Sequence, residues 1–228
     1  MNAQCKFISL SMCLACSLYA VDANLGEVTA YGKADLSTTE GTGSYTTGNM
    51  STATGLNLSI RETQQSVSVV SNQLIKDLNL KDVDTAMNYA SGITLYRDSG
   101  RDRIVSRGFN IDNIQEDGVA SSVSITAQGT LGFSKEFTDL EFYDRVEVLR
   151  GVAGLTQSNG EPGGTVNLVR KRPGDELGIN LGLSMGSWNN YRGSFDVTDA
   201  LNTDGTIRGR LIGILNKIGS FKNHKNGH

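Results

Sequence analysis

Histidine and cysteine, the side chains most often used as nucleophiles, bases and metal ligands, lie only near the ends of this chain. The 228 residues include two histidines, His224 and His228, and three cysteines, Cys5, Cys13 and Cys16. A Ser-His-Asp or Cys-His system needs an imidazole or a thiol beside its partners, and zinc-type metal cages use the same groups. The body of the chain offers neither group, so no such nucleophile and no metal site is predicted.

Carboxylates remain as acid–base groups, and the clearest pair is Asp98 with Asp102. Three arginines, Arg97, Arg101 and Arg103, lie between and around this pair. Mixed charge at this density is typical of a solvated loop, and no carboxylate pair in the chain has a spacing that singles out catalysis. We therefore predict that the protein is not an enzyme.

The first residues have the pattern of a secretory signal peptide. Lys6 is followed by the largely apolar stretch 7–18 and then by small residues. Signal peptidases cut after a small residue, which allows cleavage after Ala20 or after Ala23. The predicted signal peptide covers residues 1–23, and the mature chain is expected to contain no cysteine.

Cys16 leaves a second interpretation of this segment open. A lipoprotein signal attaches a lipid to a cysteine at its cleavage site. Such signals carry leucine three residues upstream of that cysteine, and here Cys13 stands in that place. Ordinary cleavage is therefore the favoured expectation.

The overall composition is that of one or two folded units. Hydrophobic residues make up 38% of the chain and charged residues 20%, and the formal net charge is −3. Away from the N-terminus there is no run of about 20 apolar residues, which excludes a helical membrane protein. The small net charge gives no general case for binding nucleic acid.

Residues 24–174 divide into two regions by composition. Residues 24–60 are rich in Gly, Ser and Thr from Gly32 onward, which predicts an extended, flexible linker. Residues 61–174 alternate between strand and helix patterns and are predicted to form a small α+β domain. Its strands are expected at 65–71, 104–105, 111–115, 146–149 and 166–169.

Two helices are expected inside this domain. A short one should begin near Ser71 or Asn72, because Leu74, Ile75 and Leu78 follow at helical spacing. The second has Asp82 as its N-cap and Gly92 just past its end. Its apolar positions, spaced at i, i+3, i+4 and i+7, are Val83, Ala86, Met87 and Ala90.

Residues 175–228 change to a strictly alternating pattern. Apolar side chains alternate with small or polar ones at Leu177, Ile179, Leu181, Leu183 and Met185. Further runs at 191–198 and 207–218 follow tight turns, so about three antiparallel strands are predicted, each with one apolar and one polar face, as in a transmembrane β-barrel. The edge of a soluble β-sandwich would explain one such strand but not three in succession.

Several short motifs, in a fixed order, carry a family resemblance. They are 50–56, 62–67, Ser106-Arg107-Gly108-Phe109, 117–118, 144–151, 162–167 and 170–173. Residues 27–228 resemble the beginning of a TonB-dependent outer-membrane receptor, and within that family the ferric-siderophore receptors for hydroxamate-type and pyoverdine-type ligands. Two positions depart from the family pattern. Gln64 stands where proline is usual, and Leu155-Thr156-Gln157 stands where the family more often has a pattern that contains tyrosine.

The resemblance implies an architecture and a source of energy. Such receptors are wide barrels of about 22 strands whose lumen is plugged by the N-terminal domain. They import ferric siderophores using energy passed from the inner membrane through TonB, which binds a short peptide as an added strand. The candidate peptide is Glu27, Val28, Thr29, Ala30 and Tyr31. Without the resemblance, these five residues are equally well the start of an ordinary linker.

The resemblance also assigns candidate ligand contacts to plug loops. These candidates are Arg97, Arg101, Arg103, Asn110, Asp112 and Ser122. The stretch from Arg97 to Arg107 contains four arginines and two aspartates. This surplus of positive charge suits carboxylate or hydroxamate oxygens. The alternative is that the arginines only solvate a loop or pair with the barrel wall. Neither a cofactor nor a protein ligand to iron is expected, because the siderophore supplies the oxygen donors.

Two further arginines, Arg107 and Arg150, occupy motif positions that lock the plug in the family. There they pair with glutamates on the inner wall of later barrel strands, and charge-assisted pairs of this kind are strong but exchangeable in a wet lumen. Such strands would lie beyond residue 228. We therefore expect a truncated receptor in the outer membrane; the alternative is a stand-alone periplasmic module that binds siderophore or TonB without transport.

Overall fold

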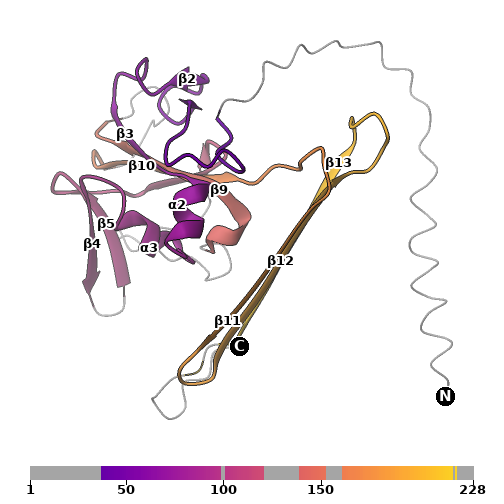
Figure 1. Ribbon diagram of the computed structural model, residues 1–228. Helices are drawn as coiled ribbons and strands as arrows, with labels where there is room; N and C mark the ends of the chain where they lie inside the picture. The colour runs from indigo at the N-terminus through magenta and orange to yellow at the C-terminus, as the bar shows by residue number, and fades with distance from the viewer. Residues whose placement is uncertain (1–36, 99–100, 121–138, 153–160, 218, 220–228) are drawn as a thin grey trace. The chain divides into compact units, whose positions relative to one another are not determined.

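A computed structural model describes residues 37–98, 101–120, 139–152, 161–217 and 219 (Figure 1). The peptide proposed to bind TonB, at 27–31, lies outside the described residues, as does Ser122. Among the residues that are described, no helix has the length and apolar character needed to cross a membrane.

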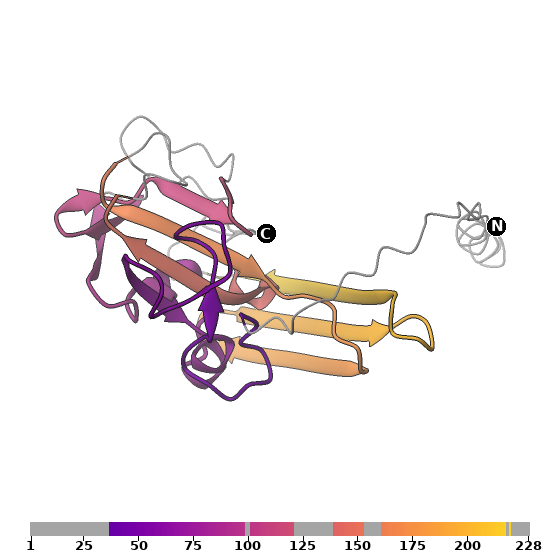
Figure 2. The same ribbon diagram turned by 90° about the horizontal axis from the view of Figure 1, so that it is seen from above.

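The largest sheet is built from five strands and confirms the predicted α+β domain (Figure 2). Its order is β3-β9-β10-β7-β8, and only β10 and β7 run parallel. The strands are β3 (Ser66–Val70), β7 (Asn113–Glu116), β8 (Val119–Ala120), β9 (Tyr143–Arg150) and β10 (Gly164–Arg170). Four of the expected strand segments fall in this sheet, while 104–105 belongs to another.

Both predicted helices are present, each with the expected side-chain cap. Helix α2 (Asn72–Asp77) is capped by Ser71, whose Oγ accepts from the Leu74 amide, and α3 (Val83–Met87) is capped by Asp82. Caps of this kind contribute about 1 kcal/mol. α3 is shorter than predicted: the chain leaves the helix after Met87, and Gly92, at φ 72°, turns it into the next strand.

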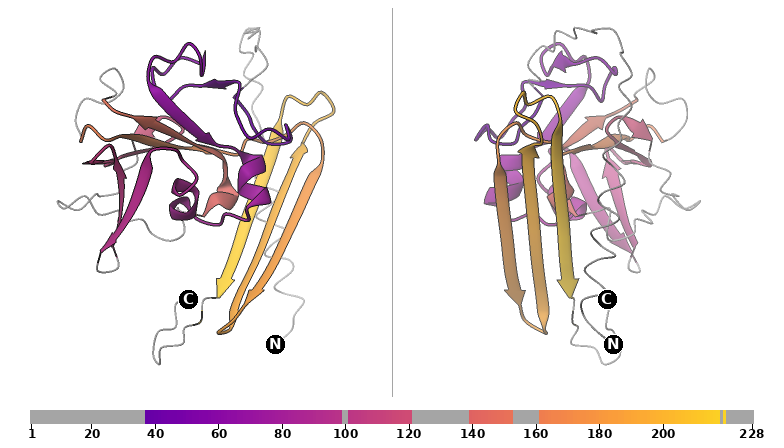
Figure 3. Two further views of the ribbon diagram at one scale, coloured as in Figure 1. Left: turned by 60° about the vertical axis from the view of Figure 1, so that its left-hand side comes forward. Right: turned by 90° about the vertical axis from the view of Figure 1, so that its right-hand side faces the viewer.

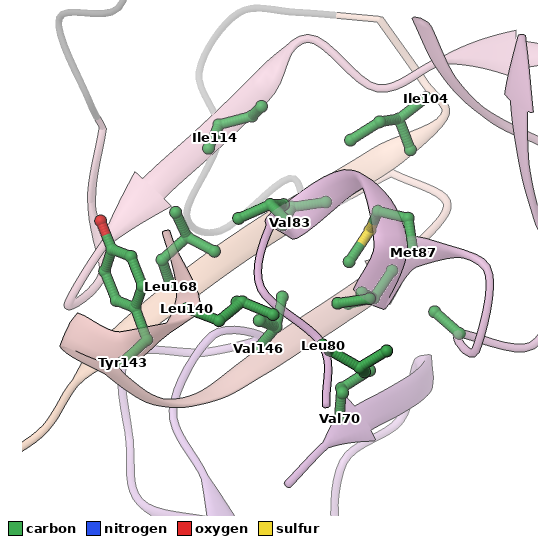
Figure 4. Close-up of a cluster of buried hydrophobic side chains, with 14 of the residues drawn as sticks. Val70, Leu80, Val83, Met87, Ile104, Ile114, Leu140, Tyr143, Val146 and Leu168 are labelled. Carbon is green, nitrogen blue, oxygen red and sulfur yellow. The ribbon is translucent and has the colours of Figure 1, made fainter. Parts of the chain in front are cut away.

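One face of the five-stranded sheet packs against these helices to form the main core (Figure 4). The core includes Val70, Leu80, Val83, Met87, Ile104, Ile114, Leu140, Tyr143, Val146 and Leu168. Leu140 belongs to the short 3₁₀ helix η2 (Leu140–Phe142), which leads directly into β9. The core fixes the sheet, and the sheet positions the polar groups on its other face.

A second sheet contains the predicted strand segment 104–105 and extends into the charged stretch that the sequence predicts as a loop. β4 (Ile93–Asp98) and β5 (Arg101–Ser106) form an antiparallel hairpin, and β6 (Phe109–Asn110) pairs with β5. The charged residues 97–98 and 101–103 are therefore paired strand residues. Mixed charge masked the strand pattern, because the alternation of Ile93 and Leu95 stops where the arginines begin.

The segment 37–60, predicted as flexible linker, differs from that expectation. Its strands β1 (Asn49–Met50) and β2 (Leu58–Ser59) pair with each other. Thr39, Thr52 and Met50 are almost completely buried. Small polar residues favour extended chain when they are solvated, but here hydrogen bonds to buried charges hold them. The predicted domain bounds 24–60, 61–174 and 175–228 stay predictions.

The three alternating runs form an antiparallel sheet, as predicted (Figure 3). Its strands are β11 (Gly178–Gly186), β12 (Asn190–Ala200) and β13 (Arg208–Lys217). β12 lies in the middle and pairs with both neighbours. Trp188 and Asn189, both at positive φ, make the tight turn between β11 and β12.

Candidate functional site

The β4–β5–β6 sheet carries four of the six predicted ligand contacts, Arg97, Arg101, Arg103 and Asn110. Its register pairs Tyr96 with Arg103, and Val105 pairs with Asn110 of β6. Because side chains alternate across a strand, Tyr96, Arg103 and Asn110 share one face of this sheet. Tyr96 is exposed, while Arg103 and Asn110 are half-buried. This face offers an aromatic ring, a guanidinium and an amide to a ligand.

The other ligand candidates are less completely placed. Backbone pairing sets Arg97 opposite Asp102 and Arg101 opposite Asp98 in the same hairpin. Asp112 lies between β6 and β7, where its Oδ1 accepts from the Glu161 amide at 3.0 Å. Asp112 therefore holds the start of the glycine-rich turn before β10.

Arg150 lies within hydrogen-bond distance of several groups of its own domain. Its guanidinium donates to the Ser66 and Ser68 hydroxyls at 3.1 and 2.9 Å, and to the carbonyls of Val67 and Ser91. Burial, followed by the positive charge of Arg107, lowers the pKa of Arg150 from its ordinary value. Two like charges thus stand side by side at the end of β9.

Arg107 differs from Arg150 in its surroundings. It is exposed and lies at φ 52°, in the tight Arg107-Gly108 turn before β6. In the part of the chain that the structure describes, no carboxylate forms an ion pair with Arg107 or with Arg150. This pair of cations suits an acidic partner, and Arg107 is the more accessible of the two.

A buried polar cluster covers the face of β9 opposite the core. The register of β9 and β10 shifts between Val169 and Arg170, which leaves Asp144 unpaired in a bulge. A bulge re-aims the side chains beside it. Asp144 and Glu147 both contact Arg145, with N–O distances of 2.9 and 2.7 Å. Two carboxylates and one cation are therefore held inside the domain.

Hydrogen bonds from the first described segment satisfy the remaining oxygens of this cluster. The amides of Thr39 and Glu40 donate to the Asp144 carboxylate at 3.0 and 2.7 Å. The Thr52 hydroxyl donates to Glu147, and Asn167 Nδ2 donates to the Thr52 hydroxyl at 2.9 Å. Buried charges persist only when they are paired and hydrogen-bonded, so segment 37–53 completes the domain.

One face of the β11–β13 sheet is apolar and exposed. The register places Leu181 beside Phe195, and it places Leu183 and Leu215 on either side of Gly193. Leu183 is 88% exposed and Leu181 77%. An exposed face lined by large apolar side chains is typical of a surface that contacts lipid or protein.

The opposite face of this sheet is polar and forms ion pairs with the α+β domain. Arg192 of β12 pairs with Asp139, at 2.7 Å, before η2. Asp196 of β12 pairs with Lys171, at 3.0 Å, after β10. Arg210 of β13 contacts both Asp196 and Glu40, each at 2.6 Å. The two faces of the sheet thus meet different environments, as in a barrel wall.

A small polar cavity of about 200 Å³ lies near this contact. Its lining includes Asn72, Lys76, Asn79, Glu141 and Lys171. Lys171 is already paired with Glu141 and Asp196. In the described ranges no group of three or more His, Cys, Asp or Glu side chains is arranged to hold a metal ion.

The ion pairs and the buried cluster were not predicted as functional groups. The sequence does give a signal for the ion pairs, because Arg192, Asp196 and Arg210 all fall on the polar parity of their strands. The polar face of these strands is expected to meet water. Charged side chains of both signs on that face indicate that a charged partner packs against it. Asp144 lies in the motif 144–151, but that motif does not indicate its partners, because the bulge that places Asp144 depends on pairing with β10.

Comparison with known proteins identifies the α+β domain. Residues 59–165 match the family model described as the TonB-dependent receptor plug domain. The chain is 42% identical over 190 residues to the ferripyoverdine receptor of Pseudomonas aeruginosa, covering 82% of this chain and 23% of that receptor. The ferrioxamine B receptor of Salmonella typhimurium is 31% identical over 160 residues, or 67% of this chain and 22% of that one.

Solved structures give the same result. The pyoverdine outer membrane receptor of Pseudomonas aeruginosa, bound to pyoverdine, matches 90% of this chain and 28% of that chain, with a TM-score of 0.73 and 36% identity. The alcaligin outer membrane receptor of Bordetella pertussis matches 79% of this chain and 31% of that chain, with a TM-score of 0.72 and 45% identity.

These matches cover the domain and the strands that follow it. The chain spans about a quarter of the length of the relatives it matches, 23% for the ferripyoverdine receptor. The relatives are named as receptors, in line with the prediction of a receptor. Residues 59–165 form a plug domain of the TonB-dependent receptors, and the chain is similar to the N-terminal part of the ferric-siderophore receptors among them.

Proposed function

We propose that this chain supplies the TonB-binding peptide, the plug and the first barrel strands of an outer-membrane receptor that imports ferric siderophores. The observation that supports this most is the β11–β13 sheet that follows the plug. Its polar face makes the ion pairs with the plug, while its apolar face is exposed. A soluble periplasmic module would have no use for such a face.

The proposed ligand is a ferric siderophore of the hydroxamate or pyoverdine type. Relatives are named for ferripyoverdine and for ferrioxamine B. The face of the β4–β5–β6 sheet with Arg103 and Asn110 is the proposed contact, with Arg97, Arg101, Asp112 and Ser122 as further candidates. Guanidinium groups are suited to the anionic oxygens of such a ligand.

Ligand binding is tested with the full chain in detergent micelles, using radioiron-labelled ferripyoverdine in equilibrium dialysis. The double variant R101Q/R103Q is expected to weaken binding at least about tenfold, since it removes two charged hydrogen-bond donors. The charge-matched control R61Q/R208Q changes two exposed arginines elsewhere. Equal binding by both double variants would contradict the proposed contact, and no binding by the unmodified chain would contradict the ligand class.

The proposed energy partner is TonB with its inner-membrane complex, bound through Glu27, Val28, Thr29, Ala30 and Tyr31. An added strand needs its backbone amides, and proline removes one. Val28→Pro should therefore abolish capture of the chain by the C-terminal domain of TonB. Gly32→Pro, outside the five residues, is the matched control. Capture that survives Val28→Pro would show that the binding peptide lies elsewhere.

The wall partners of Arg107 and Arg150 are proposed to be acidic side chains of later barrel strands. The structure supports this for Arg107, which is exposed and lies beside a second cation. Translation of the DNA that follows the codon of His228, in all three frames, tests the larger proposal. Further alternating strands would support a receptor, while an unrelated gene directly following would support a stand-alone periplasmic module.

A further inference from the structure

Thr39 and Glu40 are held from two sides at the point where the N-terminal segment meets the plug. Their backbone amides donate to the Asp144 carboxylate on β9, at 3.0 and 2.7 Å. The Glu40 side chain points to a different element. Its two oxygens accept from the Arg210 guanidinium on β13 at 2.6 and 2.8 Å. One pair of consecutive residues thus connects a plug strand with a barrel strand 170 residues further along.

From this geometry we infer that Thr39 and Glu40 form a clip that fastens the N-terminal segment of the plug to strand β13 and opens before the other plug–strand contacts do. The residues that form the clip are Thr39, Glu40, Asp144 and Arg210. A fork-to-fork contact of Glu40 with Arg210 is directional and charge-assisted. Its place, nearest to the N-terminus among the described contacts with the strands, puts it first in line when the chain is pulled from that end.

The charges explain why this contact opens readily. After Glu40 leaves, Arg210 keeps both oxygens of Asp196, at 2.8 and 2.6 Å, and the carbonyl of Arg172. Asp144 likewise keeps Arg145 at 2.9 Å. Breaking a buried ion pair is costly mainly because it leaves a charge without a partner. Opening the clip leaves no buried charge without a partner.

The contact of Arg192 on β12 lacks this property. Arg192 pairs with Asp139 at 2.7 Å and with Glu141 at 3.6 Å, and both carboxylates belong to the plug side. Separating the strands from the plug would therefore take both acidic partners from Arg192, whose side chain is 11% exposed. The strands should stay attached to the plug when the N-terminal segment is released. This order opens segment 37–53 while the lipid-facing sheet stays in place.

The role of the clip under tension rests on the proposed connection to TonB, but the clip itself is tested without TonB or siderophore. Amide hydrogen exchange is measured on the full chain in detergent micelles for Glu40→Gln, Asp196→Asn and Glu176→Gln. Glu176 is exposed and supplies the charge-matched control. Glu40→Gln should speed exchange at Thr39 and Glu40 at least about tenfold and leave β11–β13 unchanged. Asp196→Asn should instead speed exchange in β12 and β13.

Single-molecule pulling tests the order of opening. Handles are attached to the chain from residue 24 onward, which has no other cysteine, through Gly26→Cys and through Leu201→Cys in the exposed turn between β12 and β13. The first rupture should release segment 37–53, at a lower force in Glu40→Gln than in Glu176→Gln. Equal forces in the two variants, or a first rupture that detaches β11–β13, would overturn the inference. So would unchanged exchange at Thr39 and Glu40 in Glu40→Gln.

Discussion

Arg145 is the residue on which the buried cluster of the plug depends. It is the cation between Asp144 and Glu147, and all three side chains are at most 5% exposed. Thr39, Glu40 and Thr52 add hydrogen bonds, but none of them adds positive charge. The segment that the composition describes as flexible is therefore ordered by charges on β9.

Replacing this cation should strongly destabilise the plug. Arg145→Met keeps most of the side-chain volume but leaves two buried carboxylates without a positive partner, which costs about 3 to 5 kcal/mol. Urea unfolding of the full chain in detergent measures the change, with Arg61→Met at an exposed position as control. A loss below about 1 kcal/mol would show that the hydrogen bonds alone hold the carboxylates.

Glu40 makes the attachment of its segment dependent on pH. Burial would raise the pKa of Glu40, but the hydrogen bond and charge of Arg210, aided by Lys171 and Lys76, outweigh it and lower the pKa below 4.5. Its contribution to stability is therefore fully present above pH 4.5 and is lost as the pH falls through the lowered pKa. The difference in urea midpoint between the unmodified chain and Glu40→Gln should shrink accordingly on acidification. A difference that stays constant, or grows, at acidic pH would contradict the pairing.

At the scale of elements, the glycine-rich turn before β10 sets how closely strands can approach. Gly164 has φ 141°, and a Cβ placed there would clash with the Leu149 carbonyl oxygen. A Cβ on Gly163 would clash with the Asn110 carbonyl oxygen in the same way. The Pro162-Gly163-Gly164-Thr165 motif thus has a packing reason in this fold.

A methyl group at this turn should disturb the whole central sheet. Gly164→Ala must shift the backbone of β9 or β10 and should cost about 2 to 4 kcal/mol, as other strained or overpacked substitutions do. Gly174→Ala is the control, because the added Cβ would make only ordinary contacts with Thr198. Thermal unfolding of both variants gives the comparison, and equal melting temperatures would refute the expected clash.

At the scale of the whole molecule, the two faces of the β11–β13 sheet make different contacts. The polar face carries the ion pairs with the plug, and the apolar face remains exposed. In the hydrocarbon region of a membrane, every backbone N–H and C=O group must be hydrogen-bonded within the protein. In the proposed receptor, the sheet would therefore need neighbouring strands beside β11 and β13, which fits the similarity to the N-terminal part of much longer receptors.

A charge on the apolar face should weaken association with membranes. Leu183→Arg places a guanidinium where the side chain is 88% exposed, at an expected cost of about 2 to 4 kcal/mol near the bilayer centre. Asn180→Arg puts the same group on the polar parity of β11. Flotation of the refolded chain with phosphatidylcholine vesicles should be reduced by the first variant and less by the second. Equal flotation would assign lipid contact to another surface.

Local pattern was enough to predict much of this protein. Helix caps at Ser71 and Asp82, the alternating strands after Gly174 and the ordered motifs all depend on residues close together in the chain. The family and the class of fold follow from them. Only 104–105 of the hairpin β4–β5 was predicted as strand, because the pairing extends through a sequence of mixed charge. Helix α3 ends at Met87, before the turn at Gly92 that the sequence suggested as its end.

Contacts between distant residues were decided only by the tertiary structure. The sequence contains Glu40, Asp144, Asp196 and Arg210, but nothing near any of them marks the others as partners. Glu40 meets Arg210 because a bulge in β9 turns Asp144 toward the Thr39 amide and the register of β12 with β13 brings Asp196 beside Arg210. The sequence by itself determined the elements and their faces, whereas folding determined which charges meet, because ion pairs form between surfaces that only the completed sheets bring together.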